Sequence, residues 1–485
     1  MTSSQRHDRL LIGVLCTAAL AWALGQTAII PAFPELQRTL HTDPSGVAWT
    51  LTGYLLVAAV LTPVLGRVGD ILGHRRVLLW VIAALAVGNA VSAVGSSLEV
   101  VVAGRVIQGA AGGIFPLCYA ILRSELPKAT VPTGIGMISA LVGAGGGVGL
   151  ILGGALVDAG SWRLIFWICA VMAACSLVAV RVLVRPDPAM KAGRVDLRGA
   201  AVLAIGLLLP LLAISQANAW GWTAPKTLLM AGAGVLVLVG WVRLQMHTDQ
   251  PLADIPLLRR KPVMFSNAAT LMAGFGIFGS FVLIPELAQE PTSTGYGLGL
   301  DALQAGLVMV PGSIAMLVLG PVSGILGARV GHRVSMSVGC ATAALGLALI
   351  ALRHDSAVEL AVYSTLMYAG LALCFAAMPN LMVDAAPPDQ TGEATGFNAL
   401  VRTGGSSLGA QVCAAVLAGG VVAGGGVAES SYRTAFLLSA GGALVAAVLA
   451  LCIPRRTDGE HTHVSALVEI GAGSILGEPP YAGER

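Results

Sequence analysis

The chain has 485 residues, of which 56% are hydrophobic and only 11% are charged, and its mean hydropathy is +0.82. A soluble domain carries about 25% charged residues, so this composition excludes an ordinary soluble globular protein and is typical of a protein embedded in a lipid bilayer. The net charge of +3 comes without a basic patch interleaved with aromatic residues, so the sequence gives no support for nucleic-acid binding.

Long apolar blocks follow one another along the chain, separated by short charged turns. A hydrocarbon core of about 30 Å needs roughly 20 apolar residues per helix. Because lipid cannot satisfy an open sheet edge, we expect each block to be a helix, including the first, which we expect to be uncleaved although it resembles a signal peptide. The blocks predict fourteen transmembrane helices, at 10–32, 46–66, 77–96, 99–122, 133–158, 163–183, 197–216, 226–245, 263–286, 301–326, 334–352, 358–382, 395–420 and 433–453.

The lysine and arginine residues predict which side of the membrane each turn faces. An even number of spans places both termini on one side. That side holds 21 of the 28 Lys and Arg residues, the other side holds five, and two fall within spans. Loops rich in these residues stay in the cytoplasm. The sequence therefore predicts a multi-pass cell-membrane protein with both termini in the cytoplasm, and 457–485 as a disordered cytoplasmic tail.

An internal repeat divides the predicted spans. The turn GRVGDILGHRR (Gly66 to Arg76) is echoed by GILGARVGHRV (Gly324 to Val334) at an offset of 258, and ALVGAGG at 140–146 by ALVRTGG at 399–405 at an offset of 259. This predicts two six-helix bundles, 1–190 and 261–456, with two inserted transmembrane helices in 191–260. Such repeats are the architecture of transporters that rock about a central substrate site.

Asp70 lies where the second span reaches the cytoplasm, with Arg67 and Arg75 close by in the sequence. A carboxylate near a helix N-terminus, or paired with arginine, favours one closed arrangement, whereas the alternative is an ordinary charge cluster at the membrane surface. Gly66 and Gly73 allow the backbone to turn and the helices to approach closely. The pattern predicts a latch at this turn.

Two arginines fall inside spans. An unpaired Arg105 in the fourth span costs roughly 2.5–3.5 kcal/mol on insertion scales, so we expect it to face a partner, a carbonyl or a water-filled cavity. Gln108 shares its face one turn on, followed by Gly109. The same argument applies to Arg402, for which Asn398 is the predicted partner at i, i+4. For both arginines the alternative is a side chain that reaches the membrane surface.

Glycines recur every four residues in the fifth span, at Gly145, Gly149 and Gly153, and Gly154 follows. Their spelling resembles a nucleotide-binding loop, but no strand precedes it. The spacing instead predicts a small-residue face for close helix packing. The eight cysteines all lie in apolar blocks without a C-x-x-C pair, which favours buried small side chains, and no metal or cofactor is predicted.

Together these motifs resemble the major facilitator superfamily. The Gly66 turn is similar to its G-x-x-x-D-x-x-G-x-R signature, RVIQGAAGG from Arg105 to its R-x-x-Q-G motif, GAGGGVGLILGG from Gly143 to its glycine-rich antiporter motif, and SWRLIF at 161–166 to the start of its sixth helix. With fourteen spans, the chain resembles the drug:proton antiporters of that size.

The resemblance implies roles for several of these residues. Asp70, with Gly66, Gly73 and Arg75, would stabilise a cytoplasmic gate against the thirteenth span, near Gly396. Arg105 would take part in proton coupling. The glycine face of the fifth span, composed of Gly145, Gly149, Gly153 and Gly154, would seal the cavity and favour export.

The sequence departs from that family at the first span, where drug exporters commonly have L-D-x-T. Here the chain reads Leu24, Gly25, Gln26 and Thr27, so the acid inside the membrane is absent, and Leu150 stands where the antiporter motif usually has proline. A proton-coupled cycle needs a group whose pKa changes between states. Glu35 and Glu286 are the remaining candidates for protonation, with anchoring at the membrane surface as the alternative.

The sequence thus predicts an all-α, non-enzymatic transporter, monomeric in the lipid bilayer, that exports small amphipathic or cationic compounds or drugs in exchange for protons. The residues predicted to line its cavity are Gln26, Thr27, Arg105, Gln108, Gly109, Asn398 and Arg402. Alternatives are an exporter of a single metabolite or antibiotic, and a carrier not coupled to protons. A membrane-embedded enzyme would need clustered His, Asp or Cys, and an ATP-driven pump would need a G-x-x-x-x-G-K-[ST] loop.

Overall fold

The computed structural model describes residues 3–42, 44–187, 196–420 and 427–454. Over these ranges the chain forms helices and no strand, which confirms the all-α class. Eleven helices of the described chain are long and apolar enough to cross a membrane, judged by length and composition. The prediction of a multi-pass membrane protein is therefore confirmed.

The first bundle is formed by the helices that precede residue 188. They are α1 (Ser3–Thr27), η1 (Ile30–Ala32), α2 (Phe33–Thr39), α3 (Pro44–Leu72), α4 (His74–Val94), α5 (Leu98–Gln108), η2 (Gly109–Gly113), α6 (Ile114–Glu125), α7 (Val131–Asp158) and α8 (Arg163–Leu183). The predicted fourth span corresponds to α5, η2 and α6 in succession, because the helix tightens to a 3₁₀ turn over its glycines.

Two helices follow as a separate pair, α9 (Leu197–Trp220) and α10 (Pro225–Met246), and then the short α11 (Ile255–Arg259). Asp196 caps α9 by accepting the N–H of Gly199 at 2.8 Å, and Gln245 of α10 donates to the same carboxylate at 2.9 Å. The pair packs together, and α9 also contacts α3 and α17, so it lies against both bundles.

The second bundle contains the remaining helices. They are α12 (Lys261–Phe278), α13 (Ser280–Gln289), η3 (Thr292–Thr294), α14 (Ala302–Val330), α15 (His332–Leu352), α16 (Ala357–Ala385), η4 (Pro388–Gln390), α17 (Thr391–Gly419) and α18 (Glu429–Leu451). Local sequence fixes several of the starts. Asp301 forms a capping box with Gln304 at α14, and Ser356 caps α16 by accepting the N–H of Glu359.

The repeated turn has the same backbone conformation in both bundles. Gly73 joins α3 to α4 with φ +101°, and Gly331 joins α14 to α15 with φ +93°. A side chain is strained at such φ values, which explains why glycine stands at both positions. His74 and His332 then begin equivalent helices. This agreement supports the repeat seen in the sequence.

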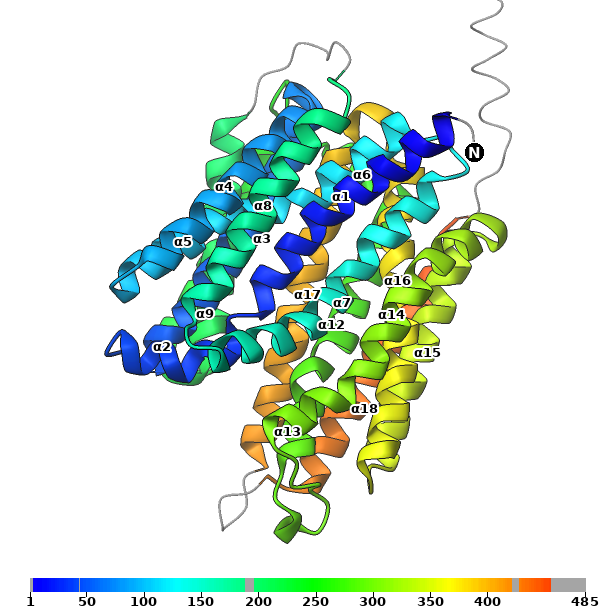
Figure 1. The fold of residues 1–485 in the computed structure, drawn as a ribbon. Helices are drawn as coiled ribbons and strands as arrows, with labels where there is room; N and C mark the ends of the chain where they lie inside the picture. The colour runs from blue at the N-terminus through cyan, green and yellow to red at the C-terminus, as the bar shows by residue number, and fades with distance from the viewer. Residues whose placement is uncertain (1–2, 43, 188–195, 421–426, 455–485) are drawn as a thin grey trace, which may run out of the picture.

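Each bundle has its own apolar core, and the two meet where α3, α6 and α7 pack against α14, α16 and α17. In Figure 1, α17 and α3 come from different bundles and contact one another, as do α7 and α14. Small residues bring α7 and α14 together, since a Cβ on Gly136 would lie 2.4 Å from the Gly320 carbonyl oxygen and one on Gly324 would lie 2.2 Å from the Pro132 oxygen. These contacts lie near the start of α7.

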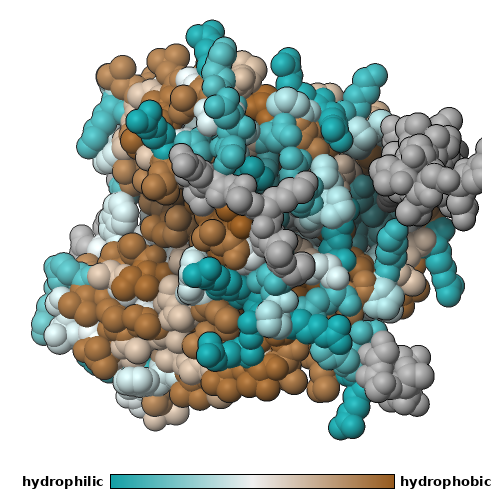
Figure 2. All heavy atoms as spheres, turned by 90° about the horizontal axis from the view of Figure 1, so that it is seen from above, coloured by the Kyte–Doolittle hydropathy of each residue, from teal (hydrophilic) through white to brown (hydrophobic). Residues whose placement is uncertain are grey.

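We name the two ends of the molecule by residues that they carry. The Asp70 end holds the start of α1 and of α17 and is at the top of Figure 1, and the Glu286 end holds α2 and α13 at the bottom. Figure 2 looks onto the Asp70 end and shows hydrophilic side chains gathered there, with hydrophobic ones at its margin. Leu229 and Leu236 on α10 are each 73% exposed, as expected of side chains that face lipid.

Candidate functional site

Asp70 joins the two bundles at the last turn of α3. Its carboxylate is buried and accepts the backbone N–H of Gly392 at 3.0 Å and that of Glu393 at 2.8 Å, both in the first turn of α17. His74 Nε2 lies 2.8 Å from the same carboxylate. A negative charge on the unsatisfied N–H groups of a helix N-terminus is stabilising. The contact forms one turn before Gly396, the residue near which the family resemblance implied a meeting with the thirteenth span.

Glycines make this contact possible. A Cβ on Gly66 would lie 2.2 Å from the Gly392 carbonyl oxygen, and a Cβ on Gly392 would lie 2.5 Å from the Gly66 oxygen. One turn on, a Cβ on Gly396 would lie 3.0 Å from the Pro63 Cα. The backbones of α3 and α17 therefore touch directly, and any side chain at Gly66 or Gly392 would push the bundles apart.

Glu393 adds a titratable group to the same contact. Its carboxylate lies 3.3 Å from the Arg67 guanidinium and accepts the backbone N–H of Asp254. Glu393 lies in the first turn of α17, outside the predicted span 395–420. Burial raises the pKa of its carboxyl to about 8, against the opposing effects of the Asp254 N–H and Arg67. This carboxyl therefore exchanges its proton near neutral pH.

Arg123 is a second contact between the bundles that sequence reasoning missed. From the end of α6 its guanidinium donates to Thr391 Oγ1 at 2.6 Å and to the carbonyls of Ala386 at 3.0 Å and Pro387 at 3.3 Å. These oxygens close the turn between α16 and α17. Every residue carries a backbone carbonyl, so no sequence pattern indicates which carbonyls Arg123 contacts. The sequence indicated only that a cation lies at the end of the fourth span. We call Asp70, Arg67, Arg123 and Glu393 the latch.

Gly73 and Arg75, which were predicted to be part of the gate, lie within the first bundle. Asp187 accepts the backbone N–H of Arg75 at 3.1 Å, and the Arg75 side chain donates to the Arg181 carbonyl at 2.6 Å. A Cβ on Gly73 would lie 2.5 Å from Asp187 Oδ2. These residues thus fix the start of α4 to the end of α8, and their gating role stays a prediction.

Arg105 is fully buried among α1, α3 and α5. Its Nε donates to the Thr50 carbonyl at 2.8 Å, and Nη1 donates to the Gly25 carbonyl at 2.8 Å and to Gln108 Oε1 at 2.7 Å. The guanidinium carbon also lies 4.4 Å from the centre of the Tyr54 ring. The expectation of carbonyl partners, and of Gln108 on the same face, is met by this geometry.

The predicted pairing of Arg402 with Asn398 is wrong. Asn398 instead donates to Asn267 Oδ1 at 2.9 Å and to Thr270 Oγ1 at 3.0 Å, both on α12. Arg402 lies over the Phe375 ring, with its guanidinium carbon 4.7 Å from the ring centre. Helical spacing put the two side chains within reach of one another, but α12 offered Asn398 better partners.

The other residues predicted to line a cavity, Thr27, Gln26 and Gly109, lie in different surroundings. Thr27 faces α7 and donates to the Gly145 carbonyl at 3.3 Å. Gln26 is half-buried. Gly109 packs against α3, since a Cβ there would lie 2.6 Å from Val57 Cβ. Thr27 and Gly109 are therefore helix-packing positions in this arrangement, and their role in substrate binding stays a prediction.

The glycine face of α7 packs against α1. A Cβ on Gly145 would lie 2.4 Å from Ala23 Cβ, one on Gly149 would lie 2.0 Å from Thr27 Oγ1, and one on Gly153 would lie 2.0 Å from the Ala28 carbonyl oxygen. Gly154 does not belong to this face, because a Cβ there would have no described atom within 4 Å. The spacing of four residues therefore predicted which glycines pack against the first helix, whereas Gly154, which follows Gly153, makes no such contact.

This difference gives a matched pair of substitutions. Gly153→Ala is expected to destabilise the protein by about 1–3 kcal/mol, because a backbone oxygen cannot move aside as a side chain can. Gly154→Ala is expected to leave stability unchanged or slightly higher, since alanine favours the helix. Thermal unfolding of the purified protein in detergent measures both. Equal melting temperatures for the two variants would contradict the packing of α7 on α1.

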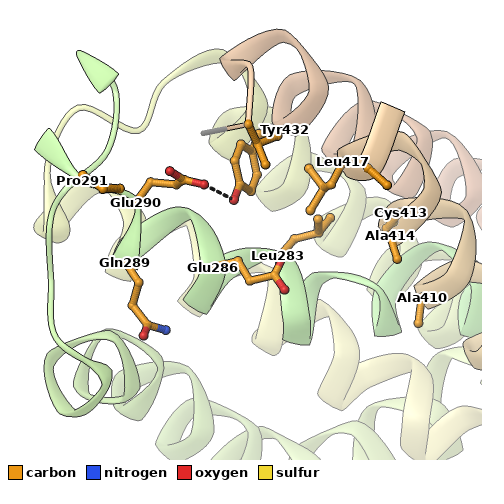
Figure 3. Close-up of a pocket in the computed structure, with 12 residues that line it drawn as sticks. Leu283, Glu286, Gln289, Glu290, Pro291, Ala410, Cys413, Ala414, Leu417 and Tyr432 are labelled. Carbon is orange, nitrogen blue, oxygen red and sulfur yellow. Dashed lines mark hydrogen bonds between the residues drawn. The ribbon is translucent and has the colours of Figure 1, made fainter. Parts of the chain in front are cut away.

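Glu35 and Glu286 lie at the Glu286 end. Glu35 accepts the backbone N–H of Trp162, just before α8, at 3.1 Å, which is a structural contact. Glu286 lines a cavity of about 520 Å³ between α13, α17 and α18. In Figure 3, Glu290 accepts the hydroxyl hydrogen bond of Tyr432 at 3.0 Å on the far side of this cavity. A protonation role for Glu35 and Glu286 stays a prediction.

The sequence matches a protein family and individual known proteins, and these are transport, export and resistance proteins. The sequence model of the Major Facilitator Superfamily matches residues 15–410 and again 267–479. A tetracenomycin C resistance and export protein of Streptomyces glaucescens is 29% identical over 82% of this chain and 73% of its own length. A uridine/deoxyuridine transporter of Lactococcus lactis is 29% identical over 82% of this chain and 85% of its own. A multidrug resistance protein B homolog of Mycobacterium tuberculosis is 30% identical over 72% and 66%.

Solved structures share the fold at low sequence identity. The human organic anion transporter TETRAN has a TM-score of 0.63 at 19% identity, covering 91% of this chain and 99% of its own. A proton:xylose symporter has a TM-score of 0.64 at 13% identity, covering 93% and 97%. At these identities the likeness concerns the fold alone.

Proposed function

The chain belongs to the major facilitator superfamily, and on this premise we propose that it exports small amphipathic organic compounds or drugs by alternating access, in exchange for protons. Relatives named for drug resistance and for antibiotic export support an exporter. A relative named as a uridine/deoxyuridine transporter favours a second candidate, a carrier of one metabolite. Members of this superfamily are transporters and not enzymes.

The observation that carries the proposal is the latch. Asp70 binds the N-terminus of α17 across the two bundles, while the glycines of α3, α7, α14 and α17 bring the backbones into contact at the same end. Two bundles joined by a few polar contacts at one end are suited to rock about a site between them. This arrangement has the Asp70 end closed.

We propose that the Asp70 end faces the cytoplasm of a cell-membrane protein. The excess of Lys and Arg in the turns on that side supports this orientation. We further propose fourteen spans, since each predicted block overlaps one helix or consecutive helices. The division into bundles 1–190 and 261–456 with an inserted pair in 191–260 belongs to the same proposal. Residues 457–485, the predicted tail, lie outside the described residues.

Glu393 supports the coupling to protons. The closed latch raises the pKa of its carboxyl to about 8, so protonation favours the closed arrangement. That contribution is fully present below the pKa of a solvated glutamate and is lost as the pH rises through about 8. Opening the latch would return the carboxyl to water, lower its pKa and release the proton into the cytoplasm. Glu35 and Glu286 remain the alternative carriers.

Everted membrane vesicles test the proposal. Wild-type vesicles are expected to accumulate amphipathic dyes, with ethidium and fluorescein as the cationic and anionic probes, several-fold faster with an imposed proton gradient than without one. Glu393→Gln is expected to transport at the same rate in both conditions, because glutamine holds the latch in its protonated form. Glu35→Gln and Glu286→Gln serve as parallel variants.

The outcomes of the vesicle assay test proton exchange, the coupling carboxyl and the substrate separately. Accumulation that ignores the gradient in wild-type vesicles would remove proton exchange and keep the exporter. Full gradient dependence in Glu393→Gln, with its loss in Glu286→Gln or Glu35→Gln, would move the coupling carboxyl to the Glu286 end. Vesicles that accumulate neither dye, while taking up uridine, would favour the carrier of one metabolite.

A further inference from the structure

Three buried hydrogen-bond donors without an acceptor of good geometry gather around Arg105. Arg105 Nη2 has no hydrogen-bond partner in the described part of the chain, and the Tyr54 hydroxyl and Trp22 Nε1 have none of good geometry beyond their proximity to one another. Their side chains are 0%, 1% and 9% exposed. The guanidinium lies over the Tyr54 ring, and the Trp22 indole lies beside the Tyr54 hydroxyl. Buried donors are almost always satisfied in native proteins, so this group points to an acceptor that binds here.

Space is left beside these donors at Gly25. The glycine is buried, yet a Cβ there would meet only one described atom within 4 Å, Cys169 Sγ at 3.9 Å. The Gly25 carbonyl is itself a partner of Arg105 Nη1 at 2.8 Å. A gap of at least the size of a methyl group therefore lies at Gly25, on the face of α1 that turns toward α8, at the residue whose carbonyl binds the guanidinium.

The charge of Arg105 is not balanced by a charged group among the described residues around it. Its hydrogen-bond acceptors are the two carbonyls and the Gln108 amide, and the titratable groups that face it are Tyr54 and Cys169, neither of which is an acid at neutral pH. A buried cation that keeps its charge is costly without a counter-charge. An anion in the gap at Gly25 would supply one.

Arg402 on α17 adds a second positive charge, on the side of the second bundle. Its guanidinium packs on Phe375 and makes no hydrogen bond or ion pair among the described residues, and it faces the Tyr119 side chain of α6. Aromatic side chains link the two regions, because the ring centres of Trp22 and Phe115 lie 4.8 Å apart and those of Phe115 and Tyr119 lie 6.2 Å apart. A chain of buried aromatic side chains thus links the surroundings of the two arginines.

We propose that Arg105, Tyr54 and Trp22 form a binding site for the anionic group of the exported compound, which is an organic anion with an apolar, aromatic body. This rests on the proposed function and narrows the amphipathic or cationic compounds expected from the sequence to amphipathic anions. The ionised group accepts from Arg105 Nη2, the Tyr54 hydroxyl and Trp22 Nε1, and occupies the volume beside Gly25. Charge-assisted hydrogen bonds of this kind are the strong ones, so recognition depends on the negative charge.

A matched pair of ligands tests the charge directly. Radiolabelled 2-naphthoate and 2-naphthylmethylammonium share one ring system and differ in the sign of their charge. Wild-type protein in lipid nanodiscs is expected to bind the naphthoate at least tenfold more tightly than the ammonium. Chloride is titrated as a competitor, because an inorganic anion has the same charge without the apolar body, and it is expected to compete only weakly.

Two substitutions test the site itself. Tyr54→Phe removes one donor and keeps the ring under Arg105, and it is expected to weaken naphthoate binding about tenfold, as the loss of a hydrogen bond to a charged group does. Gly25→Asp places a carboxylate beside Arg105, and it is expected to weaken naphthoate at least tenfold and to strengthen the ammonium. Tyr432→Phe is the control, because its hydroxyl bonds Glu290 at the Glu286 end, and naphthoate binding should not change.

The opposite results would overturn the inference. Wild-type protein that prefers the ammonium, or naphthoate binding that is equal in wild type, Tyr54→Phe and Gly25→Asp, would show that the donors serve no anion. Strong competition by chloride at millimolar concentration would assign the site to an inorganic anion instead. Export of ethidium in the vesicle assay by a protein that ignores naphthoate would contradict the inference and leave the proposed function standing.

Discussion

Asp70→Asn is expected to lower the export rate at least about tenfold while the protein remains folded and inserted in the membrane. The carboxylate accepts two N–H groups of α17 at 3.0 and 2.8 Å from the opposite bundle. An asparagine side chain keeps one acceptor and loses the charge that favours the helix N-terminus. If this weakens the latch by about 2 kcal/mol, the balance between the closed and open arrangements shifts roughly thirtyfold.

The change should be visible as a distance between the bundles. Spin labels on Leu72, at the end of α3, and Pro388, just before α17, report the separation at the Asp70 end, once the two exposed cysteines, Cys175 and Cys452, are replaced by serine. Wild type is expected to give mainly the short distance of the closed arrangement. In Asp70→Asn the longer distance should become the major one.

A control substitution exists at the same end of the molecule. Asp187 also accepts two backbone N–H groups, those of Arg75 at 3.1 Å and Arg76 at 3.3 Å, but both belong to its own bundle. Asp187→Asn is therefore expected to cost stability without changing the distance between labels. If Asp187→Asn and Asp70→Asn affect the distance and the export rate equally, the latch contributes nothing beyond helix capping.

Much of the fold was predictable because the bilayer imposes long apolar helices. The predicted block 334–352 differs from α15 (His332–Leu352) by two residues at its start, since only the edge of an apolar run is ambiguous. The meeting of Asp70 with the thirteenth block was predictable for another reason. A carboxylate at a helix end among arginines has few ways to be satisfied, and the family resemblance named the helix.

Partners that depend on tertiary packing could not be predicted. Asn398 faces α12 and not Arg402, because helical spacing shows which side chains are neighbours and not which face another helix covers. Arg123 binds carbonyl oxygens, which every residue carries. Glu393 has an ordinary sequence environment, and its high pKa arises from burial against α3 and the segment before α11. Such properties appear only once the bundles are assembled.

Arg105→Ala is expected to abolish export, by at least about a hundredfold, while the protein still reaches the membrane. The guanidinium is the shared partner of Thr50 on α3, Gly25 on α1 and Gln108 on α5. Its removal takes a donor from two carbonyls and an amide oxygen, and a buried acceptor that is left with no donor costs about 1–3 kcal/mol. It also removes the positive charge on which binding of an anion depends. Accumulation of fluorescein in everted vesicles, normalised to the amount of inserted protein, measures the effect.

Arg163→Ala is the control that distinguishes a loss of folding from a loss of transport in Arg105→Ala. Arg163 donates to the Gly95 carbonyl at 2.9 Å and lies over the Trp162 ring at 4.3 Å, so it has the same kinds of contact as Arg105 within the same bundle. Arg163→Ala is expected to lower the melting temperature as Arg105→Ala does and yet to retain most export. Arg105→Lys should fold better than Arg105→Ala, because it keeps the charge, but a single ammonium cannot reproduce the fork of the guanidinium. Near-normal export in Arg105→Ala would move the essential cation to Arg402, which makes no hydrogen bond or ion pair with the residues that the structure describes and lies near Tyr119 of the opposite bundle.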